Sequence, residues 1–297
     1  MAAMWTGFQP LTVQRDGVTL HARHGGPADD TCPPLLLLHG HPQTMAMWHR
    51  VAPVLAQTRR VVLMDLRGYG DSDRPLAGDA SAAYAKREMA LDAVELMRSL
   101  GHDRFAVLAH DRGARVAHRL LLDHPQAVTR ALLLDIAPTL AMYENTTEAF
   151  ARAYWHWFFL IQPAPLPERL IEADPPAYLR DGMGRRGGGF FDKHAWAEYE
   201  RCIALPGTAA AICADYRASA GIDLAHDRAD RDAGRRVTQP LRVLWGANGV
   251  VGRCFEPLAL WQAAADDVTG RAVDSGHYIA EEAPDVVLAE AHEFFKD

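Results

Sequence analysis

The chain has 297 residues, 49% of them hydrophobic and 23% charged, which suffices for one large buried core with room for an inserted subdomain. Its formal net charge of −7 argues against a basic surface, so we expect neither nucleic acid nor an anionic membrane as a partner. The four cysteines form no Cys-x-x-Cys pair, and the N-terminal segment carries neither a basic stretch nor an apolar run. We therefore expect a cytoplasmic protein without a bound metal or a membrane-spanning helix.

The first predicted element is an antiparallel hairpin, formed by residues 11–15 and 18–22 around Asp16-Gly17. Beyond it, short apolar runs bounded by Gly, Pro and Asp alternate with longer helical patterns. Such strands between helices predict a mostly parallel sheet covered on both faces, which is the α/β class. Further strands are expected at residues 35–38, 61–64, 105–108, 131–134, 241–245 and 271–273, and helices at 47–56, 82–100, 114–123, 257–265 and 284–295.

The pattern changes between residues 141 and 235. This segment is rich in aromatic residues and proline, has no strand-like run, and shows helical stretches at 148–160, 195–204 and 208–218. An insertion here would cover the carboxyl ends of the strands, where open α/β sheets bind their ligands. We therefore predict a core formed by residues 1–140 and 236–297, with a helical cap at 141–235.

The clearest chemical signal follows the strand expected at 105–108. There Asp111 stands between two small residues, Ala109 and Gly113, and a helix follows. This is the layout of a nucleophile elbow, whose tight turn needs small neighbours because the nucleophile adopts a strained backbone conformation. A carboxylate nucleophile suits attack on saturated carbon, and the arginines one and four residues later suit an anionic substrate.

A nucleophilic aspartate needs a base that activates water, and that base needs an orienting acid. His277 lies between the last predicted strand and the last helix, the usual place for the histidine of this architecture. The acid can follow either the sixth or the seventh strand of the sheet. Asn248 follows the seventh strand but has no carboxylate, whereas Asp135 follows the sixth. We choose Asp135 as the acid, against the alternative that it only caps the next turn.

A second loop supplies hydrogen-bond donors. Gly40-His41-Pro42 follows the strand at 35–38, and the backbone amide of His41 would pair with the amide of Arg112 to form an oxyanion hole. Such a hole would serve the second step of the reaction, when water attacks the ester carbonyl of an alkylated nucleophile.

With these features the chain resembles the α/β-hydrolase superfamily, and within it the branch of haloalkane dehalogenases and epoxide hydrolases. Many members of that branch have Trp directly after the nucleophile, where this chain has Arg112. Asp-Arg-Gly-Ala-Arg at 111–115, together with Tyr-Trp-His-Trp-Phe at 154–158, looks like a fluoroacetate (haloacetate) dehalogenase. The resemblance extends to residues 40–44, 67–72 and 275–277, and so to nearly the whole chain.

The resemblance implies roles for residues around the nucleophile. Arg112 and Arg115 would bind the substrate carboxylate, for which the planar guanidinium fork is well matched. His156, Trp157 and Tyr216 would form a halide pocket, because three converging N–H and O–H donors can stabilise a leaving fluoride. The alternatives are aromatic packing for the three pocket residues and a salt bridge to the cap for Arg115.

The resemblance also implies that the reaction needs no cofactor and no metal, that the substrate is a small haloacid, and that the protein is a homodimer. One position departs from the family, because His41 stands where we expect Phe. A polar ring at this position changes the lining of the expected pocket and leaves the catalytic residues unaffected.

The expected reaction has two steps, in which Asp111 displaces halide from a 2-haloacid and His277, oriented by Asp135, activates water to hydrolyse the ester. Epoxide hydrolysis is the nearest alternative, since it combines the same Asp–His pair with two cap tyrosines as acids. A non-catalytic binding module of the same fold ranks last, because all three catalytic residues are present. The tyrosines available for epoxide hydrolysis are Tyr143, Tyr154, Tyr178, Tyr199 and Tyr216.

Overall fold

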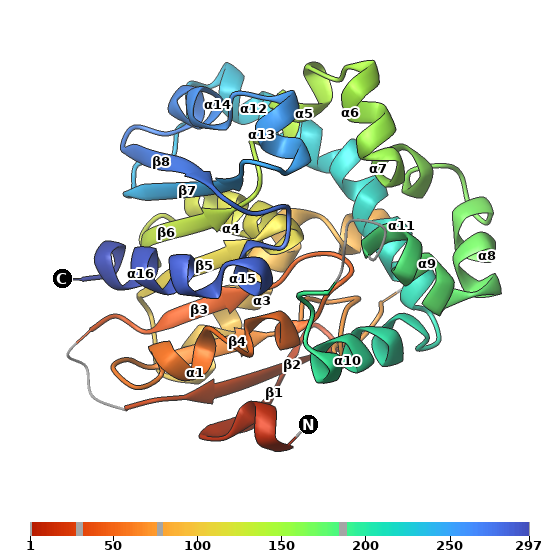
Figure 1. The fold of residues 1–297 in the computed structure, drawn as a ribbon. Helices are drawn as coiled ribbons and strands as arrows, with labels where there is room; N and C mark the ends of the chain where they lie inside the picture. The colour runs from red at the N-terminus through yellow and green to blue at the C-terminus, as the bar shows by residue number, and fades with distance from the viewer. Residues whose placement is uncertain (1, 28–31, 76–79, 184–188, 297) are drawn as a thin grey trace.

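The computed structural model describes residues 2–27, 32–75, 80–183 and 189–296, and it confirms the predicted α/β architecture (Figure 1). An eight-stranded sheet runs in the order β1-β2-β4-β3-β5-β6-β7-β8. The predicted hairpin pairs β1 with β2, β2 pairs antiparallel with β4, and all later neighbours pair in parallel. The strands are β1 Phe8–Arg15, β2 Val18–Gly25, β3 Leu35–Leu38, β4 Val61–Met64, β5 Phe105–His110, β6 Val128–Leu134, β7 Leu241–Gly246 and β8 Val268–Val273.

The central strands have no solvent-facing side. Every residue of β3, β4 and β5 is buried, which explains why these strands are continuous apolar runs without polar alternation. In Figure 1, α15 (Ile279–Glu282) and α16 (Pro284–Phe294) lie in front of the sheet, and α3 (Lys86–Ser99) and α4 (Asp111–Asp123) lie behind it. The remaining core helices are η1 Ala2–Trp5, η2 Met45–Trp48, α1 Ala52–Leu55, α2 Ala80–Ala83, α13 Val250–Cys254 and α14 Pro257–Ala264.

Two helices predicted as continuous are interrupted. The helix expected at 47–56 consists of η2 and α1, and Pro53 stands in the first turn of α1, where its missing N–H costs no hydrogen bond. The helix expected at 82–100 begins only at Lys86. The backbone N–H of Lys86 donates to the Asp223 carboxylate at 2.8 Å, so a distant side chain caps α3, which no local pattern could reveal.

A helical insertion, residues 139–232, joins β6 to β7, and its described part contains no strand. The stretch expected to be one helix at 148–160 is broken at Tyr154, whose backbone φ of −109° and ψ of 41° are not helical. The helices are α5 Thr139–Glu144, α6 Glu148–Ala153, α7 Trp155–Leu160, α8 Leu166–Ala173, α9 Pro175–Met183, α10 Lys193–Ile203, α11 Thr208–Ala220 and α12 Ile222–Asp232.

The insertion packs against one side of the sheet. In Figure 1, α8 to α11 form the right-hand side of the molecule, and α10 lies at its lower part near β2. Polar contacts anchor it to the core: Arg74 Nε donates to Thr208 Oγ1 at 2.7 Å, and the Tyr199 hydroxyl donates to Glu281 at 3.1 Å. None of the described helices has the length and apolar composition needed to cross a membrane.

Candidate active site

Asp111 lies at the junction of β5 and α4, in the tight turn that the sequence predicts. Its φ is +44°, a left-handed conformation that is strained for a residue with a side chain. Glycine permits the close packing around this turn. A Cβ on Gly40 would lie 2.6 Å from the Asp111 Cβ, and a Cβ on Gly113 would lie 2.5 Å from the His39 carbonyl oxygen. The small residues near Asp111 are therefore a steric requirement of the turn.

The structure brings the predicted base and acid together. His277 Nδ1 lies 2.5 Å from Asp135 Oδ2, and both side chains are buried. The other oxygen of Asp135 accepts the backbone N–H of Gly246 at 2.9 Å, which fixes the carboxylate toward the imidazole. Asn248, the rejected position, instead donates to Asp274 at the exposed surface. A carboxylate on Nδ1 leaves Nε2 of His277 available for water.

Two further side chains hold His277. The imidazole of His110 packs against the His277 ring with 4.6 Å between the ring centroids, and its Nε2 lies 2.8 Å from the His277 carbonyl oxygen. From the helical insertion, the Tyr154 hydroxyl lies 3.2 Å from His277 Nδ1. Burial lowers the pKa of His110 to about 3, so at neutral pH this ring is uncharged and its Nε2 can donate to the carbonyl.

The predicted oxyanion donor is in place at His41. Its backbone N–H donates to Asp111 Oδ2 at 2.9 Å. Arg112, the other predicted donor, belongs to the first turn of α4, where backbone amides have no acceptor within the helix. The His41 ring lies edge-on to Tyr216 at 5.3 Å and stacks at 6.2 Å on His156, and burial lowers its pKa to about 4. It is therefore a neutral polar ring in the site.

Asp111 is held ionised although it is buried. Burial would raise its pKa, yet the electrostatic effect of His277, Arg115 and Arg112 outweighs burial and lowers the pKa below its ordinary value. A carboxylate that remains deprotonated at all physiological pH values is the form that a nucleophile requires.

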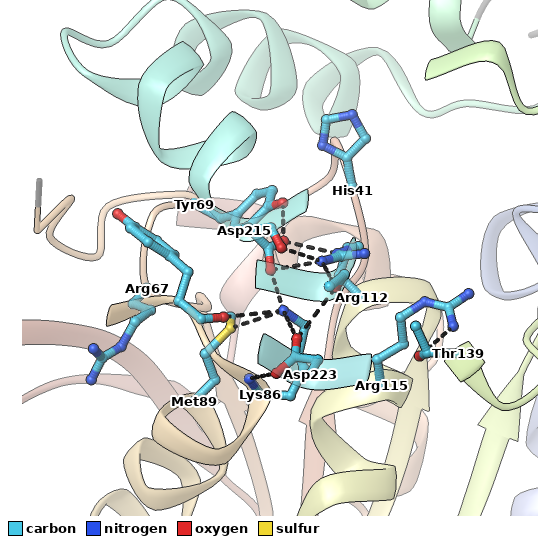
Figure 2. A network of polar contacts seen from close by, with 12 residues as sticks. His41, Arg67, Tyr69, Lys86, Met89, Arg112, Arg115, Thr139, Asp215 and Asp223 are labelled. Atoms are coloured by element: carbon cyan, nitrogen blue, oxygen red, sulfur yellow. Dashed lines mark hydrogen bonds and ion pairs between the residues drawn. The ribbon is translucent and has the colours of Figure 1, made fainter. Parts of the chain in front are cut away.

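Arg112 is already paired. Its Nε donates to Asp215 Oδ2 at 2.8 Å and its Nη2 to Asp215 Oδ1 at 2.7 Å, and Nη2 also contacts Ser219 Oγ at 2.6 Å (Figure 2). Its guanidinium stacks at 4.2 Å over the Tyr216 ring. The salt bridge to the insertion that the sequence suggested as an alternative for Arg115 is thus made by Arg112.

Arg115 has only neutral partners. Its Nη1 donates to Thr139 Oγ1 at 2.8 Å, its Nη2 lies 3.4 Å from the Met142 sulfur, and its Nε is buried without a hydrogen bond (Figure 2). Within the described residues, no carboxylate forms an ion pair with it. Burial accordingly lowers the pKa of Arg115, partly offset by the charge of Asp111, whereas Asp215 raises that of Arg112 despite burial.

The three residues of the expected halide pocket lie near the two arginines. The His156 ring is 6.0 Å from the Tyr216 ring, and Trp157 packs its indole at 4.6 Å under the Arg115 guanidinium. His156 lines the central cavity, whereas Trp157 and Tyr216 are buried beside it. In the described part of the chain, neither the Trp157 N–H nor the Tyr216 hydroxyl has a hydrogen-bond partner.

The central cavity is small. It has a volume of about 30 Å³, which accommodates only a few water-sized groups. No group of three metal-ligating side chains occurs in the ranges that the structure describes. The cavity lies between the core and the insertion and is lined by His41, Pro42, Asp111, Tyr154, Trp155, His156, Tyr178, Gly182, His277 and Tyr278.

Sequence reasoning missed the residues that support the site. Asp215 and Lys86 form a buried ion pair next to Arg112, and Thr139 holds Arg115. These three residues come from different elements and belong to no spacing motif. The one available hint was that Asp215, the single acidic residue of an alanine-rich helix, stands directly before Tyr216.

The sequence of this chain is similar to those of known hydrolases. Residues 33–184 match the family described as the alpha/beta hydrolase fold. The chain is also 41% identical to a fluoroacetate dehalogenase of Burkholderia sp, over 99% of this chain and 96% of that protein. The chain belongs to the α/β hydrolase fold family. Both the fold class and the resemblance stated from the sequence are thereby confirmed.

Other relatives broaden the range of activities. A soluble epoxide hydrolase of Corynebacterium sp. (strain C12) is 33% identical over 88% of this chain and 90% of its own length. A solved structure from Nostoc sp PCC 7120, described as an alpha/beta hydrolase, is 46% identical with a TM-score of 0.94, covering 98% of this chain and 99% of that chain. The relatives of this chain therefore include proteins named for two different reactions, fluoroacetate dehalogenation and epoxide hydrolysis.

Proposed function

We propose that this protein hydrolyses small 2-haloacids, such as fluoroacetate or chloroacetate, to the 2-hydroxy acid and halide. The observation that carries the proposal is Arg115, a buried cation without a carboxylate partner in the described structure, on the same helix as the ionised Asp111. A substrate carboxylate would supply the missing counterion and would hold its alpha carbon beside the nucleophile. The small cavity and the similarity to a fluoroacetate dehalogenase also support it.

In the first step, a carboxylate oxygen of Asp111 forms a bond to the alpha carbon as the carbon–halogen bond breaks, and the halide leaves with the bonding electrons. Because Oδ2 accepts the His41 amide, the other oxygen is the one placed to attack. Displacement inverts the alpha carbon and gives an aspartyl ester. His156, Trp157 and Tyr216 would stabilise the leaving halide through their N–H and O–H groups.

In the second step, Nε2 of His277 removes a proton from water, and the resulting hydroxide attacks the ester carbonyl of Asp111. Asp135 on Nδ1 stabilises the imidazolium that forms. The oxyanion develops on the oxygen that faces the His41 amide, and its collapse releases the hydroxy acid and regenerates the Asp111 carboxylate. No cofactor is needed for either step.

We assign the helical insertion the role of a cap. Three observations support this: its Tyr154, His156 and Tyr178 line the cavity, its Tyr154 contacts His277, and its Asp215 holds Arg112. A cap that excludes water would protect the first step from competing hydrolysis and would strengthen the contacts of the two arginines.

Homodimer formation and a cytoplasmic location belong to the same proposal. Large apolar side chains are exposed on the insertion, which supports a protein contact there. Sedimentation of the purified protein measures its oligomeric state directly, and a monomer at all concentrations would contradict the homodimer. These exposed residues are Trp155, Leu166, Leu170 and Ile222.

Epoxide hydrolysis is the second candidate, favoured by the hydroxyls of Tyr154 and Tyr178 in the cavity lining and by the epoxide hydrolase relative. A single experiment separates the two: release of halide or diol from fluoroacetate, chloroacetate, 2-halopropionate, a haloalkane and an epoxide. We expect turnover of the haloacids and little of the neutral compounds. Turnover of the epoxide alone would contradict the proposal.

A further inference from the structure

Asp215 is a buried carboxylate that the two-step reaction leaves without a role. It comes from α11 in the insertion, is completely buried, and lies between Arg112 and Lys86 (Figure 2). Lys86 at the start of α3 forms an ion pair with it, and the Tyr69 hydroxyl donates to it at 2.7 Å. Three donors from the core therefore meet on one side chain of the insertion.

The contact between Asp215 and Arg112 is bidentate, and it leaves Nη1 of the arginine available to donate a hydrogen bond to a ligand. Asp215 occupies Nε and Nη2, which form one edge of the guanidinium, and the Tyr216 ring covers one face at 4.2 Å. Among the described residues, no group accepts a hydrogen bond from Nη1 of Arg112. The fork is thus clamped on one edge, and Nη1 is the nitrogen left for a ligand.

The charges around Asp215 balance. Arg112 and Lys86 carry two positive charges, and Asp215 and Asp223 carry two negative charges, with Asp223 3.7 Å from the Lys86 amine. Lys86 helps to keep Asp215 ionised, since a buried carboxylate is stabilised by cations that donate to it directly. The cluster as a whole therefore adds little net charge to the site, and its main effect is geometric.

We propose that Asp215, supported by Lys86, is a positioning residue that orients Arg112 so that Nη1 meets the substrate carboxylate. This inference rests on the proposed function, because it assigns the carboxylate of a haloacid as the ligand of Arg112. The inference also explains why an acidic residue lies next to a site for anions. The gain from orienting the Arg112 guanidinium outweighs the repulsion between Asp215 and the substrate carboxylate.

Asp215→Asn separates positioning from charge, because the two effects have opposite signs. If charge dominates, removing a negative charge beside the site should tighten carboxylate binding. If positioning dominates, Arg112 loses its clamp and binding should weaken by roughly 10- to 100-fold, the usual effect of a misplacement of about 1 Å. The readouts are the dissociation constant of acetate by calorimetry and the KM of chloroacetate.

Two further variants make the result specific. Asp215→Glu keeps the charge and shifts the carboxylate by one methylene. If Asp215 acts by positioning Arg112, acetate binding should weaken, and if it acts by its charge alone, acetate affinity should not change. Asp215→Glu also tests the inference if Asp215→Asn does not fold. Asp230→Asn is the matched control, since Asp230 is a buried acid of α12 that pairs with Arg119 of α4 one helical turn beyond Arg115. It should lower thermal stability while acetate affinity stays unchanged.

We expect both Asp215 variants to weaken acetate binding and to raise the KM of chloroacetate by more than they lower kcat. Unchanged or tighter acetate binding in the two variants would overturn the inference. Failure of the proposed function is visible separately, as a wild-type protein that releases no halide from any haloacid. Acetate binding still decides the role of Asp215 in that case, because it requires no turnover.

Discussion

The surroundings of Arg112 and Arg115 differ in one respect, which is whether a protein carboxylate is present. Both guanidiniums are buried on α4, and both stack over an aromatic ring, Tyr216 or Trp157. Arg112 meets Asp215 through two hydrogen bonds, whereas Arg115 meets a hydroxyl, a carbonyl and a sulfur. The same residue type is therefore neutralised at one position and left charged at the other.

Under the proposed function, this difference would provide charge for one substrate carboxylate. A fully satisfied pair of arginines would offer no net attraction, and two unpaired buried cations would repel each other and cost stability. With Asp215 beside one of them, a single cation remains to be matched. The asymmetry thus fits a ligand with one negative charge. The unpaired Arg115 is expected to lower the free energy of unfolding, as is common for residues that bind substrate.

The largest effect should come from Arg115→Met, which removes the unpaired cation. We expect kcat/KM for chloroacetate to fall about 100- to 1000-fold, because a buried charge pair with the substrate is lost. The melting temperature should stay the same or rise, since Met fills similar space without a buried charge. Unchanged acetate affinity, or a large loss of stability, would contradict the assignment of Arg115 as the main anchor.

Arg112→Leu tests the paired arginine. Compared with Arg115→Met, it should lower haloacid turnover less and lower the stability of the fold more. We expect a smaller loss of haloacid turnover, about 10- to 100-fold, and a loss of about 3 kcal/mol in the free energy of unfolding from breaking a buried pair. Denaturant unfolding and steady-state kinetics measure the two effects. Any turnover of neutral substrates should survive. If the two arginine variants lose the same turnover and the same stability, the claim that Arg112 is mainly structural and Arg115 mainly binds substrate is contradicted.

Thr139→Val probes how Arg115 is held without a carboxylate. The variant removes the hydroxyl that accepts a hydrogen bond from Nη1 and keeps the shape of the side chain. We expect kcat/KM for haloacids to fall about tenfold, corresponding to about 1.4 kcal/mol, which is near the lower end for one hydrogen bond to a charged group. The control is Thr129→Val, at a β6 hydroxyl that bonds the Phe105 carbonyl and should not affect turnover.

Glu281 is the negative counterpart of Arg115, because no cation forms an ion pair with it in the described ranges. Burial raises its pKa to about 8, although Tyr199 and Gln43 donate to it. The protonated form is thus favoured in the folded state, and its contribution to stability, complete below about pH 4.5, is lost as pH rises through about 8.

Glu281→Gln imitates the protonated form at every pH. Thermal melts should therefore show little difference from the wild type at pH 5 and a more stable variant at pH 9, by on the order of 1–3 kcal/mol. No effect on haloacid turnover is expected, because the proposed reaction does not involve Glu281. A variant that is equally destabilised at both pH values would show that the carboxyl is ionised in the folded protein.

The sequence sufficed for residues whose roles are encoded locally. The apolar strands β3 to β7, the turn around Asp111 and the loop with His277 each follow from a pattern a few residues long. Asp135 could be selected because the competing position, Asn248, lacks a carboxylate. Their placement in the structure, with 2.5 Å between His277 and Asp135, agrees with that reasoning, and their catalytic roles remain predictions.

The contacts between the insertion and the core could not be predicted in the same way. Asp215 reaches Arg112 across 103 positions and Lys86 across 129, and no periodicity records such a pairing. The break before α3 has the same origin, because the Asp223 carboxylate caps Lys86 from 137 positions away. Buried polar partners are chosen by tertiary geometry, so sequence reasoning identified both arginines and missed which one is neutralised.

The covalent intermediate offers the most direct test of the account. In His277→Asn the base for the second step is absent, whereas Asp111 and both arginines are unchanged. After incubation with chloroacetate, mass spectrometry of the digested variant should show one carboxymethyl group on the peptide that contains Asp111, and halide release should stop after a single turnover. Wild-type turnover without any adduct on that peptide in the variant would contradict nucleophilic attack by Asp111.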